Sequence, residues 1–123
     1  MSLQEKLRSN GVSQAEILEV VQRIEKLLKV YIDKPFKIGK TDNPQQRVYE
    51  YTNEGHSIFK TVFEHSCLEV IDDMERYLIC YFDLKGTTTD DIINVNDGGG
   101  GRRTESPTYY IYVNIKTDNN ENN

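Results

Sequence analysis

Residues 36–51 read FKIGKTDNPQQRVYEY, a stretch that combines a strand pattern, a glycine and a helix start. Phe36 and Ile38 alternate with Lys37, a pattern that predicts a half-buried strand. Gly39 lacks a Cβ, so it is suited either to a turn or to a close approach of the backbone to another group. The stretch therefore predicts a short strand that ends near a sterically special glycine.

A helix follows this strand. Asn43 is a good N-cap, and Pro44 at the first helical position gives up no hydrogen bond. Residues four apart are neighbours on a helix, so Arg47 and Tyr51 are expected on one face. Together with Lys37 on the strand they predict a positively charged site lined by a phenol, which suits a phosphate group.

The same residues carry a family resemblance. Arg47 follows Gly39 by eight residues, and Tyr51 follows Arg47 by four. This spacing resembles the second half of the GIY-YIG nuclease core, in which a YIG strand precedes a helix that carries an arginine. Two features depart from that pattern: Lys37 replaces the tyrosine of YIG, and no GIY strand lies about ten residues upstream.

Further matches lie downstream. Glu75 in ERYLICYF resembles the single glutamate of a family helix, and Asn94 or Asn96 in INVNDGGGG resembles the asparagine that follows it. The resemblance covers roughly residues 36–101. It implies an α/β fold in which helices flank a small, mainly antiparallel three-stranded sheet, here with an extra N-terminal helix.

The last strand of the chain offers a replacement for the missing one. Residues 108–116, TYYIYVNIK, have the strongest strand pattern in the sequence, and YIYV is similar to the family's first strand. Our hypothesis is that this strand pairs with residues 36–39 by permutation. Tyr110 or Tyr112 would then stand where the family's first tyrosine stands.

The resemblance implies hydrolysis of DNA phosphodiester bonds. Arg47 would neutralise charge on the phosphate, and Glu75 would hold one divalent cation, Mg²⁺ or Mn²⁺. A phenol such as Tyr51 or Tyr112, or the amine of Lys37, would activate water. The alternative is a catalytically inactive GIY-YIG-like module that binds nucleic acid or a protein partner.

Composition sets the broad class. The chain has 123 residues, 28% of them charged, and a net charge of −5. This length predicts one domain over residues 1–116 with a disordered polar tail at 117–123. There is no apolar run of membrane-spanning length, and the first residues do not resemble a secretory signal, so we expect an intracellular protein that makes no membrane contact.

Charge is unevenly distributed. Residues 34–63 carry five basic against three acidic side chains, whereas residues 64–97 carry two against nine. The basic segment favours a local nucleic-acid contact despite the acidic total. The residues expected to make it are Lys34, Lys40, Arg102 and Arg103. The four glycines at 98–101 predict a flexible connector, or backbone N–H groups that approach a phosphate.

The N-terminal part predicts an amphipathic helix from Ser13, in the capping box SQAE, to about Val30. Its apolar stripe either packs on the sheet or forms a homodimer. Residues 57–65 predict a second strand, with Phe59, Thr61 and Phe63 on one face.

A second long helix is expected from Cys67 to Phe82. Its apolar arc contains Glu75, which predicts either a salt bridge to Lys37 or Arg47 or a metal ligand. The other acids, Asp72 included, are expected on the opposite side. Cys67 and Cys80 are too far apart along this helix for a disulfide and are expected to be reduced core thiols.

Overall fold

The computed structural model describes residues 1–53, 57–84 and 107–117. Within these ranges it has the predicted α/β fold with one small three-stranded antiparallel sheet, and four helices accompany the sheet. The glycine run, both candidate asparagines, Arg102 and Arg103 lie outside the described ranges, as does nearly all of the polar tail. The elements in chain order are α1 (Leu3–Ser9), α2 (Gln14–Val30), β1 (Phe36–Thr41), α3 (Pro44–Asn53), β2 (Ser57–His65), α4 (Leu68–Leu84) and β3 (Tyr109–Lys116).

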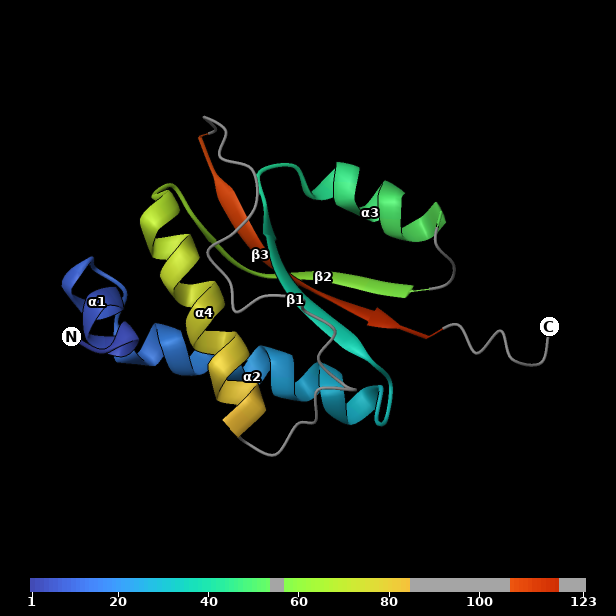
Figure 1. The fold of residues 1–123 in the computed structure, drawn as a ribbon, viewed down its shortest axis with the longest axis horizontal. Coiled ribbons are helices and arrows are strands. Elements are labelled where there is room, and N and C mark those ends of the chain that lie inside the picture. The colour runs from blue at the N-terminus through green and yellow to red at the C-terminus, as the bar shows by residue number, and fades with distance from the viewer. Residues whose placement is uncertain (54–56, 85–106, 118–123) are drawn as a thin grey trace.

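The sheet has the order β1-β3-β2, so the last strand of the chain is its central strand (Figure 1). Lys37 on β1 pairs with Asn114 on β3, and Ile58 on β2 pairs with Ile115. The predicted pairing of the C-terminal strand with residues 36–39 is therefore confirmed.

Helices cover both faces of the sheet (Figure 1). One face packs on α2 and α4, and α1 packs on α4 in turn. Aliphatic side chains that are fully buried join the two layers, each worth about 1.5–3 kcal/mol relative to exposure. They include Ile38, Ile111, Val113 and Ile115 from the sheet with Ile17, Ile24, Ile71, Met74 and Leu78 from the helices.

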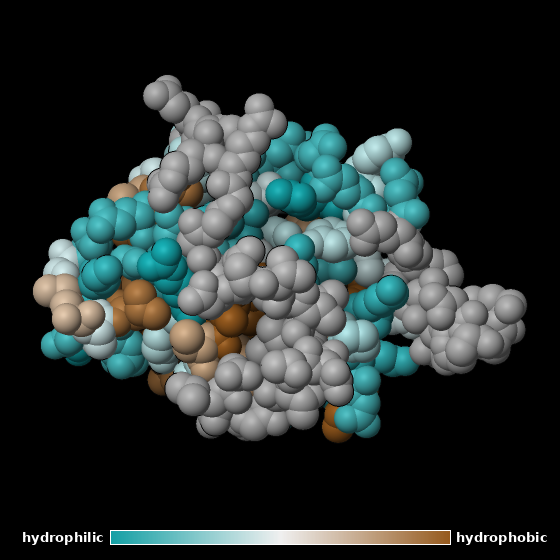
Figure 2. Space-filling model, viewed as in Figure 1, coloured by the Kyte–Doolittle hydropathy of each residue, from teal (hydrophilic) through white to brown (hydrophobic). Residues whose placement is uncertain are grey.

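Helix α3 covers the other face thinly. The N–H of Gln46 donates to Oδ1 of Asn43 at 3.1 Å, which confirms the predicted N-cap. No residue of α3 is buried, and the surface over it is mostly hydrophilic (Figure 2). Tyr51 of this helix contacts the sheet through the rings of Phe59 and Tyr112.

Helix α2 has the predicted bounds and capping box. The N–H of Ser13 donates to Glu16 at 2.9 Å, and the N–H of Glu16 donates to the Ser13 hydroxyl at 3.1 Å. Its apolar stripe is buried in the core of the same chain. This confirms packing on the sheet and leaves the proposed homodimer through this stripe without support.

Helix α1 was not anticipated, although its signal is present. Ser2 and Glu5 form the same reciprocal capping box as Ser13 and Glu16. The helix has a single buried residue, Leu7, which packs in the core. A helix this short shows little periodicity, so its cap was the only sequence signal available.

Strand β2 contains a bulge that corrects one predicted face. Thr61 pairs with Tyr112 and Phe63 pairs with Ile111, so Val62 is an extra residue in β2. Phe63 therefore lies on the core face, not with Phe59 and Thr61 as the simple alternation predicted. The guanidinium of Arg23 on α2 donates to the Val62 carbonyl at 2.9 Å and satisfies the bulged backbone.

Helix α4 corrects three expectations. It begins at Leu68, one residue after Cys67. Both Cys67 and Cys80 are free thiols as expected, but they are exposed and not part of the core. Asp72 and Asp73 are buried, so the acids of α4 are not confined to a solvent-facing side.

The central position of β3 generates a prediction about folding. A chain that ends at residue 108 should show no cooperative unfolding transition, because β1 and β2 contact each other only through β3 in the sheet. A chain that ends at residue 117 keeps every residue of the sheet and should unfold cooperatively near the temperature of the full chain. Circular dichroism during heating measures both, and cooperative melting of the shorter chain would contradict the prediction.

Candidate functional site

Tyr112 is the centre of the candidate site. It lies on β3 opposite Gly39 of β1, and its side chain is only 2% exposed. A Cβ on Gly39 would lie 2.5 Å from both the ζ carbon and the hydroxyl oxygen of Tyr112. Because real Cβ atoms do not approach this closely, the glycine serves the close backbone approach and not a turn.

Three aromatic rings meet where Tyr112 lies against the Gly39 backbone. The rings of Phe59 and Tyr112 stack with centroids 4.8 Å apart, and Tyr51 meets Tyr112 edge-on at 5.9 Å. The hydroxyl groups of Tyr51 and Tyr112 are 3.0 Å apart and hydrogen-bonded. The predicted association of Tyr51 with the motif strand is thus made through Tyr112, on the neighbouring strand.

The electrostatics of the site converge on the Tyr112 hydroxyl. Burial raises the pKa of this phenol far above its ordinary value of about 10, and the hydrogen bond to Tyr51 raises it further. The Arg47 guanidinium lowers the pKa, whereas the Glu75 carboxylate raises it. Arg47 and Glu75 therefore both act on one hydroxyl, and the phenol is neutral at neutral pH.

Arg47 is held loosely. Its guanidinium lies 3.0 Å from the Glu50 carboxylate one helical turn later, and both side chains are nearly half exposed. An exposed pair of this kind contributes at most about 1 kcal/mol. Arg47 is therefore free to exchange Glu50 for another anion at small cost.

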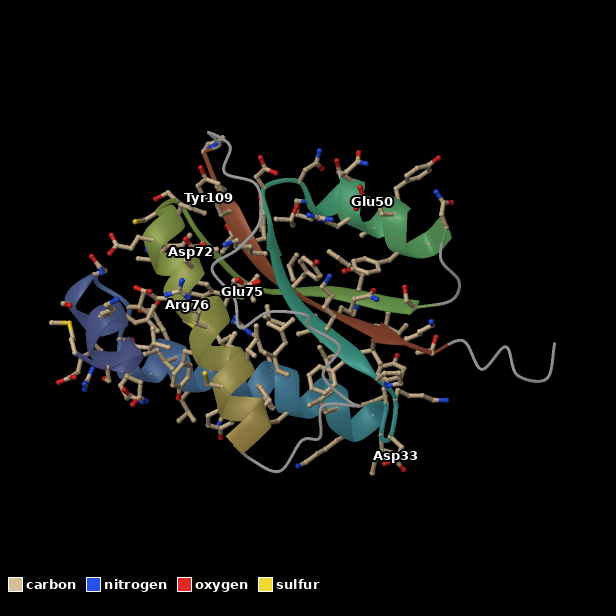
Figure 3. All side chains as sticks on the ribbon, in the orientation of Figure 1. Asp33, Glu50, Asp72, Glu75, Arg76 and Tyr109 are labelled. Carbon is tan, nitrogen blue, oxygen red and sulfur yellow. The ribbon has the colours of Figure 1, made fainter. Side chains whose placement is uncertain are left out.

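Glu75 faces inward as predicted, but its partner differs from both predicted ones. The ammonium of Lys40 lies 2.5 Å from Asp72 and 3.8 Å from Glu75, and all three side chains are largely buried. Alternation along β1 explains this, because Lys40 points to the α4 face while Lys37 points to the α3 face. Figure 3 shows Asp72 and Glu75 on α4, with Glu75 directed toward the strands.

The lysines predicted to contact phosphate or nucleic acid lie in different environments. Lys37 is partly exposed on the same sheet face as Gly39 and Tyr112. Lys34 is partly exposed just before β1. Lys40, predicted to contact nucleic acid, instead neutralises buried carboxylates.

Asp72 and Phe59 were missed as members of the site. Asp72 precedes Glu75 by three residues and so shares its helix face, a signal that was available. The sequence around Phe59 indicates only a strand. Its contact with Tyr112 depends on the pairing of β2 with β3.

The described residues offer few ligands for a divalent cation. In the described ranges, no group of three or more His, Cys, Asp or Glu side chains is placed to hold a metal ion. Glu75 provides a hard carboxylate ligand, and its charge raises the pKa of the Tyr112 hydroxyl. Mg²⁺ is commonly bound by one or two carboxylates with substrate phosphates and water completing the shell, so Glu75 fits that limited role.

Comparison with known proteins gives no assignment: no family model, curated protein or solved structure matches the chain. None of the helices in the described ranges is long and apolar enough to cross a membrane.

The contact between Gly39 and Tyr112 generates a stability prediction. Gly39→Ala should cost about 1–3 kcal/mol of unfolding free energy, because the added methyl group overlaps the Tyr112 ring. In a Tyr112→Ala background the same change should cost much less. Urea unfolding of the four proteins in this double-mutant cycle measures the coupling, and additive effects would show that the two residues do not interact.

The raised pKa of Tyr112 predicts a loss of stability in alkali. The unfolded chain ionises this phenol near pH 10, while the folded chain keeps its proton. The stabilisation is complete below about pH 10 and falls as pH rises above it, by up to about 1.4 kcal/mol per pH unit. Tyr112→Phe should flatten this dependence in urea unfolding between pH 9 and 11, and Tyr49→Phe, on the exposed face of α3, should not.

Proposed function

We propose that the chain is a metal-dependent endonuclease of the GIY-YIG type that hydrolyses DNA phosphodiester bonds. The observation that carries the proposal is the convergence at the Tyr112 hydroxyl, which is hydrogen-bonded to Tyr51 and influenced by both Arg47 and Glu75. Two phenols, a guanidinium and a carboxylate are a suitable set for phosphoryl chemistry.

The sheet order supports the proposed relationship. A C-terminal strand between β1 and β2 brings Tyr112 beside the motif glycine, Gly39. Tyr112 would thus replace the family's first tyrosine, and Tyr110, two residues earlier on the same strand face, would lie beyond Gly39 opposite Thr41.

In this mechanism Arg47 binds the scissile phosphate. Its weak pairing with Glu50 allows the guanidinium to turn to a phosphate oxygen, where a charge-assisted hydrogen bond stabilises the developing negative charge. Lys37, on the same sheet face, acts as a second clamp on the phosphate backbone.

The two phenols perform the proton work. Tyr112 stays neutral at neutral pH because burial and Tyr51 oppose its ionisation. It therefore positions the attacking water through a hydrogen bond. As this water loses a proton to Tyr112, Tyr112 passes its own proton to Tyr51 and Tyr51 releases one to solvent, so that both phenols stay neutral. A divalent cation bound by Glu75 would supply positive charge to the phosphate and its leaving group.

One observation favours a second candidate, an inactive GIY-YIG-like module that binds nucleic acid. The Lys40 ammonium already lies between the Asp72 and Glu75 carboxylates. A resident cation in this position competes with a divalent cation for Glu75 and could hold the site in a binding-only state.

Plasmid cleavage distinguishes the two candidates. With Mg²⁺ or Mn²⁺, the wild-type chain should nick supercoiled DNA, and Arg47→Ala and Glu75→Gln should each lower the rate roughly 10²-fold or more. DNA binding should survive Glu75→Gln. Absence of cleavage under every condition, together with retained binding, would favour the inactive module.

Two exposed side chains provide matched controls. Glu69→Gln removes a carboxylate from the same helix, and Arg8→Ala removes a guanidinium from α1. Neither should change the rate by more than about twofold. Cleavage that persists unchanged in Arg47→Ala and Glu75→Gln would come from a contaminating nuclease.

A further inference from the structure

Three side chains form a row across the sheet on the face that α3 covers. Asn114 of β3 is directly opposite Lys37 of β1 on one side and Phe59 of β2 on the other. Directly opposite residues in antiparallel strands have Cβ atoms about 4.5–5.5 Å apart. The row therefore places an ammonium group, an amide and an aromatic ring beside one another.

The amide in the middle of the row has a hydrogen-bond acceptor without a donor. Asn114 is 4% exposed, and its Oδ1 atom is buried without a hydrogen-bond partner. Native proteins leave few buried acceptors unpaired, because such a group loses its water without replacement. A hydrophobic residue would suit this buried position better than an asparagine whose Oδ1 atom accepts no hydrogen bond.

Each member of the row matches one part of a nucleotide. An asparagine amide pairs with the edge of a base, accepting from an N–H group with Oδ1 and donating with its NH₂ group. The ring of Phe59 is partly exposed and stacks on Tyr112 through one face, which leaves its other face for a base. An ammonium such as that of Lys37 contacts the phosphate next to it.

We infer that the row Lys37, Asn114 and Phe59 is a subsite for one unpaired nucleobase of a DNA strand. The inference rests on the proposed function, which places the strand's phosphate at Tyr112. Asn114 is two residues from Tyr112 on β3, about 7 Å along the strand, a distance that one extended nucleotide spans. Because both faces of a base are stacked on its neighbours in duplex DNA, only a single-stranded or extruded nucleotide can stack on Phe59.

In the described part of the chain, the row is reached from the edge of the sheet. β1 is an edge strand, so among the described residues only Lys37 precedes Asn114 in the row on that side (Figure 1). The lysine stem is flexible and can move aside while its ammonium stays with a phosphate. The cover from α3 is also thin, since no residue of this helix is buried.

Fluorescence anisotropy with two single-stranded probes of equal length and charge tests the subsite. One is an oligonucleotide of eight deoxyadenosines, and the other has abasic sugars in place of every base. The wild-type chain, without divalent cation, should bind the first about tenfold more tightly than the second, since stacking and base pairing act only on the first.

Asn114→Leu gives the informative variant, because leucine has the branched shape of asparagine without polar atoms. It should reduce the preference for the base-containing probe about fivefold and leave binding of the abasic probe unchanged. It should also raise the melting temperature by about 2–6 °C, since a buried unpaired acceptor has been removed. Asn114→Val, which is smaller and β-branched, replaces it if leucine does not fit.

Thr61→Val is the matched control. It removes a hydroxyl group from the same sheet face, in the next row of β2, and should leave the tenfold preference intact. A higher melting temperature in Asn114→Leu with an unchanged base preference would overturn the subsite, and so would a lower melting temperature with an unchanged preference.

The two proposals fail in different ways. Equal binding of both probes by the wild-type chain would overturn the base subsite while leaving the proposed nuclease activity standing. Failure to bind either probe would overturn the subsite, and if the plasmid were also neither bound nor cleaved, the proposed function would fall with it.

Discussion

The insertion of the last strand between the two earlier ones is the constraint on which the structure depends. β1 and β2 do not pair with each other, so the sheet forms only when β3 arrives from the far end of the chain. The aliphatic face of β3 then fills the core against α2 and α4, while its other face carries Tyr112 and Asn114. Pairings this distant in sequence carry a large entropy cost before any contact forms, which makes β3 the step that commits the fold.

The sheet separates two kinds of side-chain environment. The face toward α2 and α4 is aliphatic and densely packed. An ionic cluster of Lys40 with Asp72 and Glu75 lies at its β1 side. The face toward α3 carries phenols, an amide and an ammonium beneath a helix without buried residues. Stability therefore comes mainly from the first face, and the second tolerates polar groups.

Tyr112 joins these two environments. Its ring crosses the backbone at Gly39, so its hydroxyl is influenced by Arg47 from α3 and by Glu75 from α4. The opposite effects of the guanidinium and the carboxylate make the phenol sensitive to any charge that changes nearby. Lys40 in turn lies beside the Glu75 carboxylate and balances its charge.

The sequence by itself determined the local elements: the strand at Phe36, the cap at Asn43, the stripe of α2 and the inward position of Glu75. Each follows from periodicity or from one capping interaction within a few residues. It also suggested that the last strand pairs with β1. Only the tertiary structure decided that Lys40 is the partner of Glu75, that the bulge turns Phe63 into the core, that Asp72 is buried and that Tyr112 crosses Gly39. These depend on strand register and on which helix packs on which face, and such contacts between distant residues leave no periodic trace in the chain.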